Sequence, residues 1–348
     1  MRRRGFTLVE VMISLAVLML VMSAVSTFFL GTLQTYKQQS RVVQSGMDSI
    51  IGLEMLRRDI ERAGYGLPWN NLPAYNEAAS GILNDSPTNA PPRGIVSVNG
   101  GGLNSSDYLV IKASTVTTSD AGRKWTTLQM GDVKRSWTTV PANAENLNGT
   151  DLVIVMSPGN TGTNWRSLVV DGVGNWFTTF NNTSGFQPAT AADTRVIYGI
   201  DGAGGNLWMP FNRADYTVST ANVPERCAPN TGVLVKRVVL QTNGNLDTAL
   251  PLLDCVASMQ VQYDLDTNGD GVVESPPAND ISGLTAAQIR DQVRQVRVSL
   301  LAHEGQRDPG YTHSPTTISV AGNAVDISAN ANYRWKVYTL MVTPDNLR

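Results

Sequence analysis

An acidic run in the last third of the chain, Asp264 to Glu274, has oxygen-bearing side chains at the spacing of a calcium loop. With Asp266 as the first position, a ligand falls on every second residue and a glycine stands where the backbone must turn sharply. The expected ligands are the side chains of Asp266, Asn268, Asp270 and Glu274 and the carbonyl of Val272, with Asp264 in addition. Because hard cations prefer such oxygen ligands, the run predicts a Ca²⁺ site.

The run departs from the full pattern at its twelfth position, where Pro277 replaces a bidentate glutamate. The missing ligand predicts a weak site, with a dissociation constant of about 10⁻⁴ to 10⁻³ M, or a ligand supplied by Asp264 or Asp280. An acidic Asn-Gly hairpin turn that binds no metal uses the same residues and remains the alternative.

No residue pattern indicates catalysis, and we expect a protein that is not an enzyme. His303 and His313 are the only histidines, too few for a convincing zinc site, and both are expected on the surface or in loops. Five tryptophans could form a sugar- or surface-binding patch, although burial in a β core is the favoured interpretation. These are Trp125, Trp137, Trp165, Trp176 and Trp208.

The segment from Gly5 to Leu30 is almost entirely apolar and directly follows three arginines, Arg2 to Arg4. No charged residue lies between Glu10 and Lys37, so a helix here is long enough to cross a hydrocarbon core of about 30 Å. The arginines should hold the short leader in the cytoplasm and place the rest of the chain outside. Glu10 costs about 2.5–3.5 kcal/mol in such a segment, so it requires a partner.

The motif GFTLVE, from Gly5 to Glu10, resembles the N-terminal methylation signal of type IV pilins and type II secretion pseudopilins. The resemblance implies that a prepilin peptidase cuts after Gly5 and that Phe6 becomes the methylated first residue. It also implies that Glu10 pairs with the terminal amine of a neighbouring subunit. The helix end MLRRDIERAGYG, Met55 to Gly66, narrows the resemblance to PilW-type minor pilins, which the late strands of the chain also resemble.

This resemblance implies a structural minor pilin that acts in type IV pilus assembly, in a tip or initiation complex. Its implied partners are other minor pilins, the major pilin, the inner-membrane assembly platform and a tip adhesin. It would lie in the bacterial inner membrane first and in the pilus, or fimbrium, afterwards. A J-like type II secretion pseudopilin is the alternative of the same class. A secreted calcium-dependent binding protein or hydrolase, with a signal peptide cut near Ala24-Val25-Ser26, is the alternative of another class.

Two cysteines, Cys227 and Cys255, fall in the part of the chain that we place outside the cytoplasm, where disulfides persist. We therefore expect them to be paired, with two buried free thiols as the alternative. Closing this loop should stabilise the fold by roughly 3.6 kcal/mol on the chain-entropy model.

The expected fold class is α+β, a long N-terminal helix packed against a β-rich head. We divide the chain into a leader (1–5), a transmembrane or filament-core helix (6–33), an amphipathic helix half (34–66) and the head (67–348). Apolar residues at helical spacing continue the helix to the glycines after Ala63: Val43, Met47, Ile50, Leu53, Leu56, Ile60 and Ala63. The charged residues between them, including Asp59, are expected on a solvated face.

Short runs of β-forming residues separated by turn residues predict the strands of the head. They cover residues 95–98, 105–114, 149–158, 195–200, 233–240, 255–265 and 333–342, and residues 284–304 predict a short helix followed by a strand. Removal of the leader leaves about five more acidic than basic residues, which gives no indication of nucleic-acid binding.

The Gly5→Ala variant should remain an unprocessed precursor in the membrane, because the peptidase signal depends on the glycine before Phe6. Gel mobility and N-terminal sequencing report the processing. A variant that still matures to a methylated Phe6 would remove the basis for the assembly signal.

Overall fold

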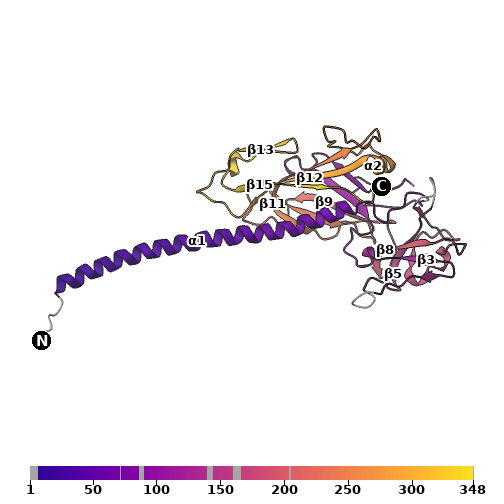
Figure 1. Cartoon of the computed structure of the whole chain (residues 1–348), viewed down its shortest axis with the longest axis horizontal. Coiled ribbons are helices and arrows are strands. Elements are labelled where there is room, and N and C mark those ends of the chain that lie inside the picture. Colours follow the sequence, from indigo (N-terminus) through magenta and orange to yellow (C-terminus); the bar gives the residue numbers. More distant parts are fainter. Residues whose placement is uncertain are drawn as a thin grey trace, which may run out of the picture.

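The computed structural model describes residues 7–70, 72–85, 90–138, 144–159, 166–203 and 205–347. For residues 31, 34, 35, 37–49 and 203 the description covers the backbone alone. Figure 1 shows a long helix that leads from the N-terminal end of the molecule into a β-rich head. The α+β fold class predicted from the sequence is confirmed.

The helix α1 (Leu8–Glu61) is continuous over 54 residues, because no proline interrupts it and both of its ends are capped. Thr7 and Glu10 form a capping box at the start. At the end, Gly64 and Gly66 adopt positive φ angles of 84° and 69°, a conformation that favours glycine and turns the chain away from the helix axis.

The larger sheet has seven antiparallel strands, and its long central strands lie against the C-terminal part of α1 (Figure 1). In spatial order the strands are β1 (Ile95–Val98), β2 (Tyr108–Ala113), β9 (Asn212–Ser219), β10 (Gly232–Val238), β11 (Leu250–Leu265), β12 (Val293–Glu304) and β15 (Arg334–Val342). The helix α2 (Ala286–Gln292) leads into β12, as the sequence predicts.

A second sheet is inserted between β2 and β9, which are neighbours in the larger sheet. Its strands are β3 (Trp125–Gln129), β4 (Val133–Lys134), β5 (Asp151–Ser157), β6 (Ser167–Leu168), β7 (Thr178–Thr179) and β8 (Arg195–Ala203). In Figure 1, β3, β5 and β8 lie at the end of the molecule opposite the N-terminus. A separate hairpin pairs β13 (Thr317–Val320) with β14 (Asn323–Asp326).

The main core lies between α1 and the larger sheet. Leu53, Leu56 and Ile60 are buried there against alternate residues of β11 and β12, such as Met259 and Val298. Burying a side chain of this size contributes about 1.5–3 kcal/mol, so this face fixes the helix to the head. The predicted contact of Ile50 is wrong, because Ile50 is 68% exposed and lies before the helix reaches the sheet.

The prediction missed several strands, of which β9 is the most central. Its sequence, NRADYTVS, alternates Ala214, Tyr216 and Val218 toward the core with charged residues on the other face. Arg213 and Asp215 are nevertheless buried, because the described part of the segment after α1, including Glu77 and Ile82, covers that face. A strand with two charges and no apolar run gave too weak a signal for a central strand.

Gly52 marks the closest approach of α1 to the sheet. A Cβ atom placed there would lie 1.9 Å from the carbonyl oxygen of Leu252, which is part of the β11 backbone and cannot rotate away. Only glycine allows the helix to pack at this distance.

Gly52→Ala should therefore destabilise the protein by about 1–3 kcal/mol through overpacking, although alanine favours an isolated helix by about 1 kcal/mol. Thermal unfolding of the full chain in detergent measures the change. Ile51→Ala, at a position 68% exposed, is the matched control and should change the melting temperature little. Equal or higher stability of the Gly52 variant would show that the helix does not pack as described.

Candidate assembly site

Glu10 occupies the N-terminal turn of α1 and closes its capping box. Its carboxylate accepts hydrogen bonds from the Thr7 backbone N–H and hydroxyl, both at 2.9 Å, and Thr7 Oγ1 accepts one from the Glu10 N–H. The positive end of the helix dipole favours a carboxylate at this position. The single chain thus stabilises Glu10 locally, while its side chain remains exposed to any neighbour.

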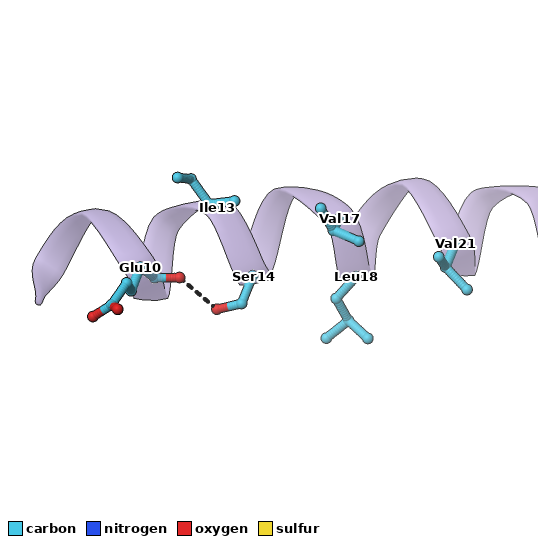
Figure 2. A pocket seen from close by; sticks show the side chains of 6 residues that line it. All are labelled: Glu10, Ile13, Ser14, Val17, Leu18 and Val21. Atoms are coloured by element: carbon cyan, nitrogen blue, oxygen red, sulfur yellow. Dashed lines mark hydrogen bonds between the residues drawn. The ribbon is translucent and has the colours of Figure 1, made fainter. Parts of the chain in front are cut away.

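The surface next to Glu10 is almost entirely apolar. Figure 2 shows Ser14 and Leu18 following Glu10 along one side of the helix, with the Ser14 hydroxyl donating to the Glu10 carbonyl oxygen at 2.9 Å. Leu8–Leu30 is long and apolar enough to cross a membrane, and none of its most apolar window is buried in the protein. An exposed apolar surface of this extent requires lipid or other helices to cover it.

At the other end of α1, Asp59 is buried and anchors the helix to the sheet. Its Oδ2 accepts hydrogen bonds from Lys236 of β10 and from the Tyr216 hydroxyl of β9. Burial, followed by the nearby Asp59 charge, raises the pKa of Tyr216 well above its ordinary value, so this phenol remains a donor. The expected solvated position of Asp59 is wrong, because a partner from the distant strand β10 compensates its charge.

The predicted calcium ligands are held by the protein itself. The Asp266 carboxylate accepts hydrogen bonds from Arg294 Nη2 at 2.6 Å and from the Gly269 and Gly271 N–H groups. The Arg294 hydrogen bond, ahead of the backbone donors, keeps the pKa of Asp266 below its ordinary value. The Asp264 carboxylate forms a separate ion pair with Arg297 Nη2 at 2.8 Å.

The remaining loop residues bond within the loop. Asn268 donates to Asp270, Glu274 accepts from the Thr267 N–H and hydroxyl, and the side chain of Val272 is 66% exposed. Among the described residues, this loop does not bring three acidic side chains within 4.8 Å of one another. The ligand set therefore fits a cation only after Arg294 moves and the loop closes.

Cys227 and Cys255 form the disulfide that the sequence predicts, and it links β11 to the loop before β10. His303 of β12 lies beside it and is 3% exposed, so the expected surface position is wrong. Its Nε2 accepts a hydrogen bond from the Ala228 N–H at 2.8 Å, and its Nδ1 is buried without a partner among the described residues. Burial lowers the pKa of His303 to about 4, so the imidazole is neutral.

Of the five tryptophans singled out in the sequence, the four that the structure describes are not fully buried. Trp125 is 37% exposed and its ring lies 5.0 Å from that of Trp137, while Trp176 and Trp208 are half-buried. Trp165 lies outside the described residues, as do the processing residues Gly5 and Phe6. The favoured interpretation of a buried β core is therefore wrong for Trp125.

A buried ionic cluster was not foreseen from the sequence. Glu77 accepts from Lys112 Nζ at 2.7 Å and from Arg213 Nη1 at 3.1 Å, and the cluster extends to Asp85, Arg93 and Asp215. Its three cations and three carboxylates balance, which is how a protein tolerates buried charge. The only sequence signal was one charge within β2, at Lys112, and two charges at alternate residues of β9, at Arg213 and Asp215.

Two family models match this chain. Residues 215–346 match type IV pilus-assembly protein W (PilW), and residues 1–26 match the prokaryotic N-terminal methylation motif. A solved type IV-like pilin from Thermus thermophilus is similar at 16% identity over 40% of this chain and 80% of its own, with a TM-score of 0.19. That score is too low to carry an argument. A comparison with curated proteins gave no match.

In its methylation-motif match, its exposed apolar helix and its sheet-rich head, the chain resembles a protein of the type IV pilin class. The PilW match, together with the methylation motif, supports a type IV pilus minor pilin with a prepilin-type signal and a role in pilus assembly. The type II pseudopilin and the secreted calcium-dependent protein are not favoured.

The neutral state of His303 predicts a loss of stability in acid. The unfolded chain binds a proton near pH 6.5 and the folded chain only near pH 4, so stability present above pH 6.5 is lost as the pH falls toward 4. The full difference is about 3 kcal/mol.

Denaturant unfolding of the full chain in detergent at pH 7.5 and at pH 4 measures this loss. His303→Gln can still accept from the Ala228 N–H and should lose less stability over the same range, whereas His313→Gln should behave as the native chain does. If His303→Gln shows the same acid dependence as the native chain, His303 does not titrate as described.

Proposed function

We propose that this minor pilin enters the bacterial inner membrane through the apolar part of α1 and is cut after Gly5. It then joins a tip or initiation complex of a type IV pilus. The observation that carries the proposal is the exposed segment Leu8–Leu30 with Glu10 at its N-terminal end. Residues 1–5 are the leader in this proposal, 6–33 the membrane or filament-core segment, 34–66 the helix half that reaches the head, and 67–348 the head.

The proposed partners follow from what can cover the apolar segment. Lipid covers it before assembly, and the equivalent helices of other minor pilins and of the major pilin cover it afterwards. The inner-membrane platform and a tip adhesin are further proposed partners. Arg2 to Arg4 support a cytoplasmic N-terminus with the head outside. The role is structural and needs no reaction.

Glu10 can serve either its own helix or a neighbouring subunit. The capping box already provides the carboxylate with two donors from Thr7, and such a cap contributes about 1 kcal/mol. A charged terminal amine offers a stronger, charge-assisted hydrogen bond, particularly away from water. We therefore expect the amine of a neighbouring subunit to replace Thr7 as the main partner of Glu10 on assembly.

Glu10→Ala should be inserted and processed normally but should join the other minor pilins poorly, because the pairing charge is gone. Co-purification with the other minor pilins and the number of surface pili measure the effect. Thr7→Ala is the matched control, since it removes the capping hydroxyl and retains the carboxylate.

If Glu10 acts only as a helix cap, both variants should have the same small effect. If it pairs with a neighbour, Thr7→Ala should assemble nearly normally while Glu10→Ala fails. Unchanged co-purification of Glu10→Ala would count against the pairing.

A weak calcium site in the loop from Asp264 to Glu274 is part of the same proposal. The spacing of Asp266, Asn268 and Asp270 supports it, and exposed Asp270 is open to solvent. The bond between Arg294 and Asp266 opposes it, because a cation must displace the guanidinium. Both observations favour binding only at high calcium concentration.

Calcium should stabilise the full chain in detergent and so raise its melting temperature. At a hundredfold excess over the dissociation constant, the gain in the free energy of unfolding is about 2.7 kcal/mol. Asp270→Ala should abolish the shift, Arg294→Gln should strengthen it by freeing Asp266, and Asp326→Ala, at a remote site, should leave it unchanged. Identical melting temperatures in EDTA and in millimolar calcium would show that the loop is a turn that binds no calcium.

A further inference from the structure

A pocket of about 240 Å³ lies on the second sheet, where that sheet approaches the end of α1. Its walls include Met156, Ser157 and Pro158 at the end of β5, Val196 and Tyr198 of β8, and Arg166 just before β6. We call it the junction pocket. It is smaller than the roughly 300–1,000 Å³ pockets of drug-sized ligands, so it fits a single ring with its substituents.

Arg166 gives this pocket a positive charge that no carboxylate of the described residues neutralises. Among the described residues, no carboxylate lies within 4.0 Å of the Arg166 guanidinium, which instead stacks 4.7 Å from the ring centre of Trp69. Arg290 stacks on the same ring at 4.3 Å and likewise makes no ion pair in the described chain. Two half-buried cations thus share one aromatic ring. The three fully buried cations that the structure describes in the head, Lys112, Arg213 and Lys236, each have an acidic partner.

The described residues use little of the hydrogen-bonding capacity of Arg166. A guanidinium carries five N–H donors in a planar fork that matches a carboxylate. Only Nη1 donates to described residues, to the Gly64 and Asn346 carbonyl oxygens at 3.2 and 3.4 Å. The Arg166 backbone is held in position, since its carbonyl oxygen accepts from the Trp69 N–H at 2.9 Å. A fixed cation with free donors is suited to bind an anion.

Aromatic rings continue from the pocket across the sheet. Tyr198 stands opposite Trp125 of β3, so the two side chains share one face with their Cβ atoms about 5 Å apart. Trp137 extends the row, and Arg135 stacks on it at 4.1 Å. Sugar rings pack their apolar faces on such aromatic side chains, as other amphipathic ligands do.

From these features we propose that the junction pocket binds the uronic-acid unit of an acidic oligosaccharide. Arg166 receives the carboxylate, Tyr198 contacts the sugar ring, and the next unit lies on Trp125. The site lies on the second sheet, whose strands β3, β5 and β8 stand at the end of the molecule opposite the N-terminus (Figure 1), and it is outside residues 215–346, which match PilW. This inference does not depend on the assembly role of Glu10.

A nucleic acid also combines negative charge with stackable rings, but its affinity comes from many phosphate contacts at once. Here one guanidinium lines the pocket, and the chain as a whole is acidic. The observations therefore favour a single carboxylate over a phosphate backbone, and the oligonucleotide serves as a competing ligand in the test.

Isothermal titration of the full chain in detergent with tri-galacturonate, and with neutral maltotriose of the same length, tests the proposal. Tri-galacturonate should bind and maltotriose should not. Arg166→Gln should weaken binding by about 10- to 150-fold, the range for a hydrogen bond to a charged group. Arg290→Gln removes the neighbouring cation outside the pocket and should retain binding within a few-fold.

Two further variants separate binding from folding. Val196→Phe fills the pocket with Arg166 in place and should also lose tri-galacturonate, at an unchanged melting temperature. Arg166→Lys keeps the charge without the fork and should bind at an intermediate strength. It is the decisive variant if Arg166→Gln does not fold.

Trp125→Ala should weaken tri-galacturonate more than it weakens the galacturonate monomer. Three results would overturn the proposal: no binding of tri-galacturonate by the folded chain, equal binding of maltotriose, or tighter binding of a thymidine oligonucleotide of the same charge. Equal affinity for acetate would reduce the pocket to a general anion site and would overturn the sugar assignment.

Discussion

The buried ion pair between Asp59 and Lys236 determines how the whole molecule is arranged. It lies under the last turns of α1, where the Tyr216 hydroxyl also donates to Asp59 Oδ2. Breaking one side of such a pair leaves an uncompensated buried charge, typically at a cost of about 3–5 kcal/mol. Apolar contacts hold α1 on the sheet, but they tolerate rotation and sliding. An ion pair between one carboxylate and one ammonium group tolerates neither movement, because the two groups must stay in contact. This pair therefore fixes the rotation and register of the helix.

The two ends of α1 lie in different environments. Its last turns are buried against β11 and β12, with Gly52 allowing the closest approach, whereas its first turns, apart from Glu10 and Ser14, present apolar side chains to the surroundings. Because no proline or glycine pair interrupts the chain between them, any force on the exposed part is carried to the head as rigid-body motion. The orientation set at Asp59 therefore also sets the direction in which Glu10 faces a neighbour.

Features with local signals could be predicted from the sequence. Neighbouring residues determine the apolar helix, its capping residues and the strands with runs of β-forming residues. The compartment predicts the pairing of Cys227 with Cys255. Asp59, Arg213 and His303 could not be placed, because their partners lie far away in the sequence and only the tertiary fold brings them together. A charged residue in an amphipathic pattern is predicted to be solvated, because the pattern does not show its distant partner. The cation pair around Trp69 was missed for the same reason.

The inserted sheet leaves the larger sheet and returns to it at a single point. Ala113 of β2 and Asn212 of β9 are paired, and the Asn212 side chain donates to the Ser114 and Ile200 carbonyl oxygens across the base of the insertion. In topological terms, β2 and β9 are the two arms of one hairpin, and residues 114–211 are its loop. A loop of this length adds only about 3 kcal/mol of closure entropy over a four-residue turn, and the insertion offsets that with its own hydrophobic core around Leu128, Val153 and Ile197. The pairing register of β2 with β9 does not depend on the residues inserted between these strands. The inserted sheet at this end of the protein can therefore change in size and specificity while the strands beneath it stay in place.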